Sequence, residues 1–164
     1  MRLIALLFIL TATPAVAGVF FKSLDVEKVR VITPSTLEFV LGYASGYENG
    51  VLKLSISNVD FGSSESVDCR NADHLACERL TQLFERSKVK VYLNEFEYDS
   101  EKFKGQVYVD GKNLEHIMLS EGWYKFDYKQ SRNKHLLMLQ KEAMCKGKGI
   151  WAGYSSSLDE MCNI

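Results

Sequence analysis

The chain has 164 residues, of which 46% are hydrophobic and 25% charged, enough to build one folded core. This composition excludes a largely disordered or low-complexity protein. Lys and Arg total 20 against 21 Asp and Glu, so no overall basic surplus indicates binding to nucleic acid phosphates, although a local basic groove is compatible with this balance.

Residues 1–17 have the pattern of a secretory signal peptide. Arg2 precedes an apolar run that ends at Leu10, and the small residues Ala15-Val16-Ala17 form a cleavage site. The alternative is a membrane anchor, but a helix needs about 20 apolar residues to cross a bilayer and this run is shorter. We therefore expect a secreted or periplasmic monomer with no transmembrane segment in its mature form, in which residues 18–164 make one domain.

Five segments that alternate in polarity or are rich in β-branched residues predict β-strands. In chain order they are Val29–Thr33, Leu37–Leu41, Val51–Val59, Lys88–Glu95 and Gly105–Val109. Pro34 separates the first two segments as a turn, and Asp110-Gly111 is a strong turn signal after the fifth.

Three segments with apolar residues three or four positions apart predict helices. They are Asp73–Ser87, Asn113–Glu121 and Arg132–Lys146, and Gly122 and Gly147 follow the last two as C-terminal caps. Three strands, a helix, two strands and two helices are typical of a mainly β fold with helices. We predict a five-stranded Greek-key barrel of the OB type plus three helices. An open α+β sandwich would give a similar pattern.

Four cysteines can form disulfides in an oxidising compartment. Three pairings are open, and we expect Cys69 to pair with Cys77 and Cys145 with Cys162, because this pairing closes the shortest loops. The alternative is a zinc site made by Cys69, His74 and Cys77. A structural zinc ion takes four protein ligands, and this segment offers three.

Three short motifs in the C-terminal half occur in a fixed order. They are the strand and turn Tyr108–Lys112 (YVDGK), the step Glu121-Gly122, and Gly149-Ile150-Trp151 after the last helix. Together they resemble the staphylococcal nuclease family, and the resemblance covers about Val26–Gly153. It implies an OB fold and a nuclease that hydrolyses phosphodiester bonds of DNA or RNA with Ca²⁺ as its cofactor.

The first turn departs from this family. Members that cleave nucleic acids resemble V-x-V-I-D-G-D-T there, whereas this chain has VRVITPST over Val29–Thr36. Thr33 and Ser35 therefore stand where the family places carboxylates. Because calcium takes six to eight oxygen ligands and prefers carboxylates, we expect weak calcium binding or none.

The family's next motif, R-L-x-x-I-D-x-P-E, is also largely replaced. Its match is Ser55–Ser63, in which Asp60 survives as a candidate metal ligand, while Ser55 and Ser63 replace the Arg and the Glu. A lone Asp60 is also typical of a loop carboxylate that caps a turn.

Three charged residues are candidate catalytic replacements. They are Lys53 on the strand of Ser55, Glu65 near Ser63, and Lys102 in the place of a later family Arg. Lysine keeps a positive charge but lacks the planar guanidinium. The alternative is that both lysines are solvated surface residues.

An aromatic segment, Trp123–Tyr128, provides candidates for nucleic acid binding. Tyr124 and Tyr128 could stack on bases beside Lys125, as aromatic residues of OB folds do, or could belong to the core and its rim. Our interpretation is a catalytically degenerate module, without a cofactor, that binds protein or nucleic acid. The alternative is an active, calcium-dependent nuclease with a rearranged site.

Overall fold

The computed structural model describes residues 23–41, 50–60, 67–70, 74–97, 102–153 and 162. Its five long strands are β1 (Ser23–Thr33), β2 (Thr36–Leu41), β3 (Val51–Ile56), β5 (Val89–Glu97) and β6 (Lys102–Val109). The five predicted strands are thus confirmed, although β1 begins earlier than expected and β3 ends earlier. Three strands of two residues were not predicted: β4 (Val59–Asp60), β7 (Lys112–Asn113) and β8 (Lys125–Phe126).

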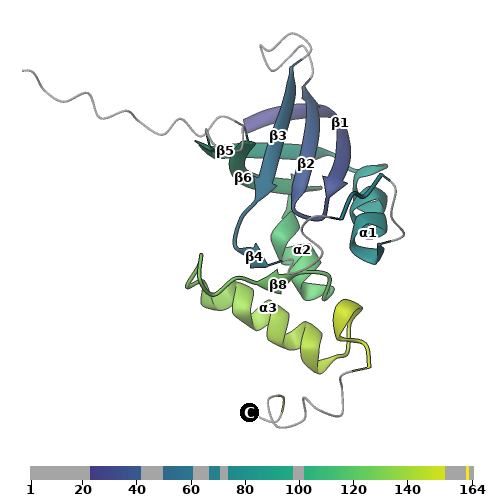
Figure 1. Ribbon diagram of the computed structural model, residues 1–164, viewed down its shortest axis with the longest axis vertical. Coiled ribbons are helices and arrows are strands. Elements are labelled where there is room, and N and C mark those ends of the chain that lie inside the picture. The colour runs from purple at the N-terminus through teal and green to yellow at the C-terminus, as the bar shows by residue number, and fades with distance from the viewer. Residues whose placement is uncertain are drawn as a thin grey trace, which may run out of the picture.

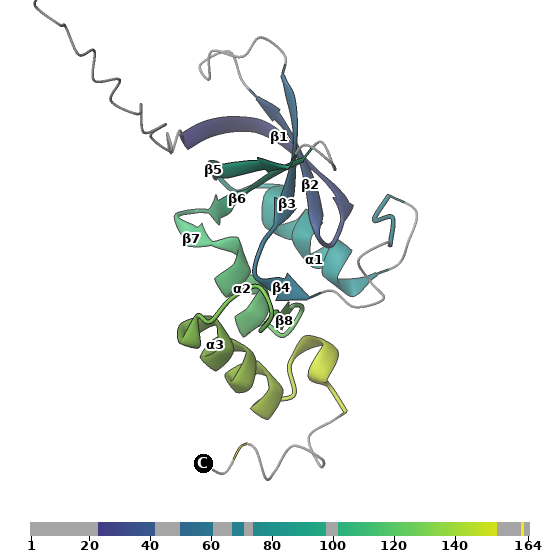
Figure 2. The ribbon, with the colours of Figure 1, turned by 60° about the vertical axis from the view of Figure 1, so that its left-hand side comes forward.

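The strand order supports the OB-type prediction. Pairing runs β3-β2-β1-β5-β6-β7, and β3 also pairs in parallel with β6, from Leu54 opposite Phe103 to Ile56 opposite Gly105. Each of the five long strands therefore pairs with two others, which an open sandwich does not require. Figures 1 and 2 show β1, β2 and β3 curving across β5 and β6.

The predicted helices are confirmed with narrower bounds: α1 (Leu75–Phe84), α2 (Leu114–Ser120) and α3 (Lys134–Cys145), followed by a short 3₁₀ helix, η3 (Gly149–Trp151). Asn113 and Asn133 begin α2 and α3, because their side chains accept hydrogen bonds from the backbone N–H groups of His116 and His135. In Figure 1, α2 lies below the strands and α3 lies farther out, beyond β4 and β8. Within the described residues, no helix combines the length and the apolar character needed to cross a membrane.

The core lies between the inner faces of the strands and the helices. Alternation on β2 buries Leu37 and Phe39, and Leu54 of β3 and Val91 of β5 meet them from the facing strands. Met118 of α2 closes this core from below and is also fully buried. The same alternation places the intervening residues of β2 and β3, among them Glu38 and Lys53, on the outer face.

The motif Tyr108–Lys112 forms a two-residue hairpin. Asp110 and Gly111 have φ angles of 49° and 78°, and Val109 pairs with Lys112 across the turn. Positive φ at both central residues matches the right-handed twist of the flanking strands, which is why Asp-Gly is favoured here. The turn signal read from the sequence is therefore confirmed.

The other two C-terminal motifs contact each other. Gly122 has a φ of 79°, and a Cβ there would overlap the backbone carbonyl of Lys148. The Ile150 N–H donates to the Gly122 carbonyl oxygen at 3.0 Å. We call Gly122 with Lys148–Ile150 the glycine junction. It joins the end of α2 to η3, and only a residue without a side chain fits at its centre.

Candidate functional site

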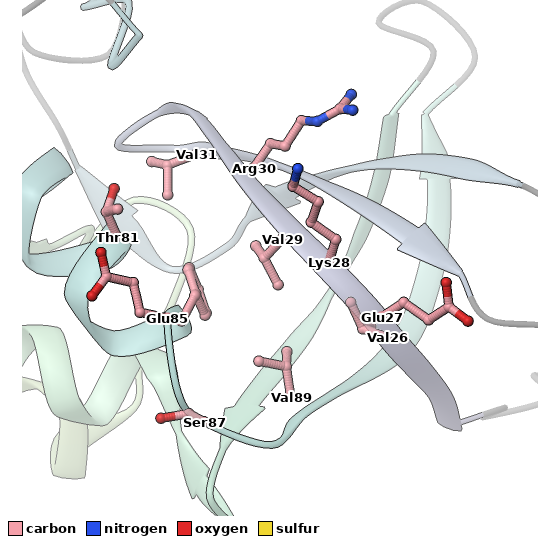
Figure 3. Close-up of a pocket in the computed structure, with 11 residues that line it drawn as sticks. Val26, Glu27, Lys28, Val29, Arg30, Val31, Thr81, Glu85, Ser87 and Val89 are labelled. Carbon is pink, nitrogen blue, oxygen red and sulfur yellow. The ribbon is translucent and has the colours of Figure 1, made fainter.

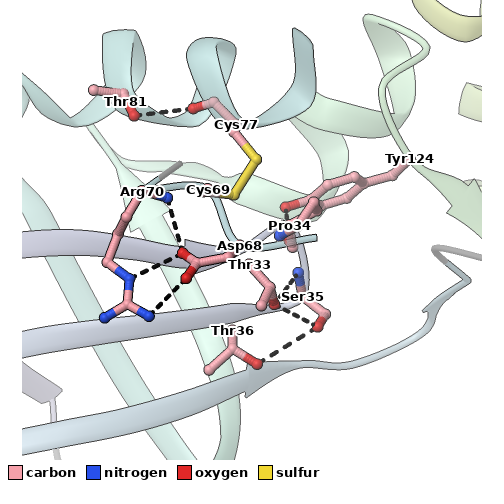
Figure 4. The surroundings of a disulfide bond; sticks show 10 residues. All are labelled: Thr33, Pro34, Ser35, Thr36, Asp68, Cys69, Arg70, Cys77, Thr81 and Tyr124. Atoms are coloured by element: carbon pink, nitrogen blue, oxygen red, sulfur yellow. Dashed lines mark hydrogen bonds and ion pairs between the residues drawn. A yellow bond between two sulfur atoms is a disulfide. The ribbon is translucent and has the colours of Figure 1, made fainter. Parts of the chain in front are cut away.

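The turn between β1 and β2, Thr33–Thr36, is here called the corner. Pro34 is fully buried, and the Tyr124 hydroxyl donates to its carbonyl oxygen at 2.8 Å (Figure 4). The Ile56 N–H donates to the Ser35 carbonyl oxygen at 2.9 Å. The backbone of the corner is therefore held from both sides, by the end of β3 and by the segment after α2.

The side chains of the corner satisfy one another. The Thr33 and Ser35 hydroxyl oxygens lie 2.9 Å apart, and the Ser35 hydroxyl lies 3.5 Å from that of Thr36. Lys102 at the start of β6 donates from Nζ to Thr36 Oγ1 at 3.4 Å. An ammonium group thus supplies the positive charge at the corner.

This donor set does not fit a calcium ion. Calcium takes six to eight oxygen ligands, usually including carboxylates, and the corner offers neutral hydroxyls that already bond to each other. Among the described residues, no group of three or more His, Cys, Asp or Glu side chains is placed to hold a metal ion. Ser63 and Glu65 lie outside the described residues.

A disulfide covers the corner from the outside (Figure 4). Cys69 is bonded to Cys77 of α1, and the Cys69 N–H donates to the Ile32 carbonyl oxygen at 2.9 Å. The predicted pairing is confirmed for this bridge and for Cys145–Cys162. The zinc alternative is wrong, because both sulfurs that it needed are in the disulfide.

The same segment brings in a carboxylate that sequence analysis missed. Asp68 precedes Cys69, and its two oxygens accept hydrogen bonds from the Arg70 guanidinium at 2.9 and 2.8 Å. The side-chain and backbone hydrogen bonds from Arg70 lower the pKa of Asp68 from 3.8 to about 2. No motif marks this pair in the sequence. Only the contact of Cys69 with Ile32 places it beside the corner.

The outer face of the sheet beside the corner carries mostly basic side chains. Because paired residues on neighbouring strands share a face, Arg30, Glu38 and Lys53 form one row across β1, β2 and β3. Glu38 binds Arg30 at 2.7 Å. Lys28 lies two residues before Arg30 on the same strand, and in Figure 3 both point away from the valines of β1.

The next row links this face to the corner. Thr36 is opposite Ser55, and Ser55 is opposite Lys104 of β6. Since Lys102 reaches Thr36, it belongs to the same surface. We call this surface the basic face, which consists of the side chains of Lys28, Arg30, Lys53, Lys102 and Lys104.

The structure places the candidate catalytic lysines and the candidate metal ligand in two different regions. Lys53 and Lys102 both lie on the basic face. Asp60 lies on β4 opposite Lys125 of β8 and lines a different pocket. Glu65 lies outside the described residues.

That pocket, of about 320 Å³, gathers several residues of the candidate binding segment. It is lined by Asp60, Lys125, Tyr128 and Trp151 with neighbouring residues of β8 and α3. Tyr128 is 56% exposed, and Lys125 Nζ lies 5.6 Å from the centre of the Trp151 ring. Exposed aromatic rings beside lysines can stack bases and pair with phosphates.

The prediction that Tyr124 stacks on bases needs correction. Its side chain is fully buried, so neither ring face is open to a ligand. Burial, and then the charge of Glu115, raises the pKa of Tyr124, and its hydroxyl remains the donor to Pro34. Tyr124 therefore supports the corner.

Glu115 of α2 is a buried carboxylic acid behind the corner. Asn58 donates to Glu115 Oε2 at 3.4 Å, and among the described residues Oε1 has no hydrogen-bond partner. Burial raises the pKa of Glu115 to about 7, while the Asn58 hydrogen bond acts in the opposite direction. The side chain is 5% exposed, so its charge bears on stability more than on ligand binding.

A larger pocket of about 410 Å³ lies between β1 and α1 (Figure 3). Val29 and Val31 point into it from β1, and Val89 of β5 lies across from them. Thr81 and Glu85 bound it on the side of α1. Lys28 and Arg30 also line this pocket, so its rim adjoins the basic face, whereas the valines supply its apolar part.

Comparison with known proteins identifies the C-terminal part of this architecture. The family model of staphylococcal nuclease homologues matches residues 69–153. No curated protein matches the chain. The matched range contains all three C-terminal motifs and begins after the corner, so it does not include that turn.

Proposed function

Because the chain belongs to the staphylococcal nuclease family, we propose that it binds single-stranded nucleic acid on the basic face without cleaving it by calcium chemistry. The observation that carries this proposal is the placement of Lys53 and Lys102 beside a corner of neutral hydroxyls. Lysine ammonium groups attract phosphates as point charges, and hydroxyl groups donate to phosphate oxygens.

The absence of net basic charge does not oppose this function. Five basic side chains share one face, where Glu38 is paired with Arg30. Binding to a phosphate backbone depends on local charge and falls steeply with salt. The pocket of Asp60, Lys125 and Tyr128 lies at β4 and β8 and would add a ring on which bases can stack.

Hydrolysis through calcium would need groups that the corner does not supply. A metal-dependent phosphodiesterase requires a metal ion, a base or water-positioning carboxylate, and donors for the charge that develops on the phosphate. Lys102 could serve as one such donor. Loss of a single electrostatic contributor typically lowers the rate about 10²–10³-fold, so the loss of several should leave little activity.

Export of the mature protein is part of the proposal. The pattern of residues 1–17 and the two disulfides both suit an oxidising compartment. The proposed site of action is therefore outside the cytoplasm, in the periplasm or the medium.

The test measures binding and cleavage in one experiment. The mature, oxidised protein is titrated into a fluorescein-labelled single-stranded DNA, with CaCl₂ or with EDTA, and the DNA is then analysed on a denaturing gel. We expect the anisotropy to rise equally in both buffers and the DNA to remain intact. Lys53→Gln and Lys102→Gln should each weaken binding and lower the salt slope by about 0.7.

The matched control is Lys88→Gln, which removes an exposed lysine just before β5 that is not one of the five residues of the basic face. It should bind like the unaltered protein. Calcium-dependent cleavage that is abolished by Asp60→Ala would instead establish the alternative, a nuclease with a rearranged site. Absence of binding in low salt would overturn the proposal and favour a protein ligand.

A further inference from the structure

Two histidines that are distant in sequence meet between the helices α2 and α3. His116 lies in the first turn of α2 and His135 in the first turn of α3. Their rings are 5.0 Å apart between centroids, at an interplanar angle of 68°. This contact is unrelated to the corner and to the basic face, and the proposed function makes no use of it.

The ring nitrogens of this pair are available. In the described part of the chain, the hydrogen bonds of both residues involve their backbone N–H groups, which the capping side chains of Asn113 and Asn133 accept. His135 is exposed and His116 half-buried, so an ion from solvent can reach both rings. An unpaired imidazole pair is unusual at a helix contact, because apolar side chains would pack there without losing hydrogen bonds to water.

The spacing of the rings suits a shared metal ion. Two imidazoles on one tetrahedral zinc ion, each with a Zn–N bond of about 2.0–2.1 Å, have their ring centroids about 5 Å apart. Imidazole binds borderline transition metals and not the hard cations Ca²⁺ and Mg²⁺.

We propose that His116 and His135 form a two-histidine site for Zn²⁺ that bridges the first turns of α2 and α3. Since no third His, Cys, Asp or Glu joins them among the described residues, water would complete the coordination. With two protein ligands in place of four, the dissociation constant should be modest, on the order of 10 µM. The bound ion would clamp α3 to α2, and α2 also carries one side of the glycine junction.

The experiment titrates ZnCl₂ into the oxidised mature protein by calorimetry, without reductant, so that all four cysteines stay in disulfides. We expect one Zn²⁺ per chain and an increase in Tm. His116→Gln and His135→Gln should each weaken binding at least 10-fold, because a single imidazole remains. His74→Gln is the matched control and should bind as the unaltered protein does, since His74 precedes α1.

NMR spectra of the unaltered protein provide a readout that does not depend on variants folding. Zinc should shift the imidazole Cε1–H and Cδ2–H signals of His116 and His135 and leave those of His74 in place. Excess MgCl₂ or CaCl₂ should not displace the zinc. The proposal is overturned by absence of binding at 1 mM zinc, by shifts at His74 alone, or by unchanged affinity in the double His116→Gln/His135→Gln variant.

Discussion

The glycine junction and the corner respond differently to sequence change. At the junction, Gly122 has a positive φ and lies against the Lys148 backbone, so no other residue type fits. At the corner, Thr33 and Ser35 carry neutral hydroxyls, and hydrogen bonds from Tyr124 and Ile56 hold the backbone of the turn. A turn closed by Pro34 and held by hydrogen bonds tolerates many side chains, whereas a steric contact between backbones does not.

This difference separates fold from chemistry in the chain. The family match over residues 69–153 contains the junction and not the corner. The segment that identifies the family therefore includes the glycine junction, where a close contact between backbones leaves no room for a side chain. The side chains at the corner are not needed to form the turn, so they can be exchanged without loss of the architecture.

The largest expected effect is at the junction. Gly122→Ala should lower the free energy of unfolding by about 4 kcal/mol, because it adds a side chain at positive φ and forces the Lys148 carbonyl to move. Urea denaturation monitored by tryptophan fluorescence measures this change.

The matched control is Gly147→Ala. Gly147 also has a positive φ, of 57°, but nothing lies within 4 Å of an added Cβ. Gly147→Ala should lower the free energy of unfolding by about 1–2 kcal/mol, which is the cost of placing alanine at a positive φ. Equal costs at both glycines would show that the contact between Gly122 and Lys148 contributes nothing to stability.

The next effect concerns Glu115, the buried carboxylic acid of α2, and the pH dependence of stability. Glu115→Gln should leave stability unchanged near pH 4 and raise it by about 3 kcal/mol near pH 8, because the folded-state pKa of about 7 lies above the ordinary 4.5. The folded protein binds more protons than the unfolded chain between these two values. Ionisation of Glu115 therefore lowers the stability of the unaltered protein as pH rises from about 4.5 to 7.

Urea denaturation at several pH values measures this difference. Glu78→Gln, at an exposed position in the first turn of α1, is the control for loss of a carboxylate at the surface. A difference between Glu115→Gln and the unaltered protein that does not change with pH would contradict a buried, proton-linked carboxyl group.

Much of the fold could be predicted from the sequence, because periodicity and turn residues report local geometry. The alternation in Val89–Glu97 and the Asp110-Gly111 turn each specify an element by themselves. Strands β4 and β8 were missed, because a two-residue strand has no periodicity to detect. The segment Trp123–Tyr128 was ambiguous for a related reason: alternation within it buries Tyr124 and exposes Lys125, and only the facing elements decide which side is inside.

The candidate site was harder to predict, since its parts come from distant segments. The basic face depends on register, which sets Arg30 opposite Glu38 and Glu38 opposite Lys53. A shift of one residue would turn Lys53 into the core. Asp68 lies beside the corner because the neighbouring Cys69 is held there by its disulfide and by Ile32. The sequence predicted this disulfide but not its position in space. The neutral side chains of the corner, in contrast, could be read directly from the sequence of the turn.

A smaller effect is expected from removing the cover of the corner. The double variant Cys69→Ala/Cys77→Ala should lose about 2.5 kcal/mol by the loop-entropy relation for a separation of 8 residues. Thermal unfolding with and without the bridge measures it. The corner keeps its hydrogen bonds to Tyr124 and Ile56, so single-stranded DNA binding should persist. Loss of DNA binding in a folded variant would mean that the bridge itself shapes the basic face.

The smallest effect is expected from Tyr124→Phe, which tests how the corner is held. It removes the hydroxyl that donates to the Pro34 carbonyl oxygen at 2.8 Å and leaves that buried oxygen without this donor. The free energy of unfolding should fall by about 1–2 kcal/mol, the usual cost of an unsatisfied buried acceptor. Tyr128→Phe, at an exposed ring, is the control and should change stability by less than about 0.5 kcal/mol. If Tyr124→Phe costs no more than Tyr128→Phe, the hydrogen bond does not secure the corner, and tolerance of neutral side chains there must come from β-strand pairing alone.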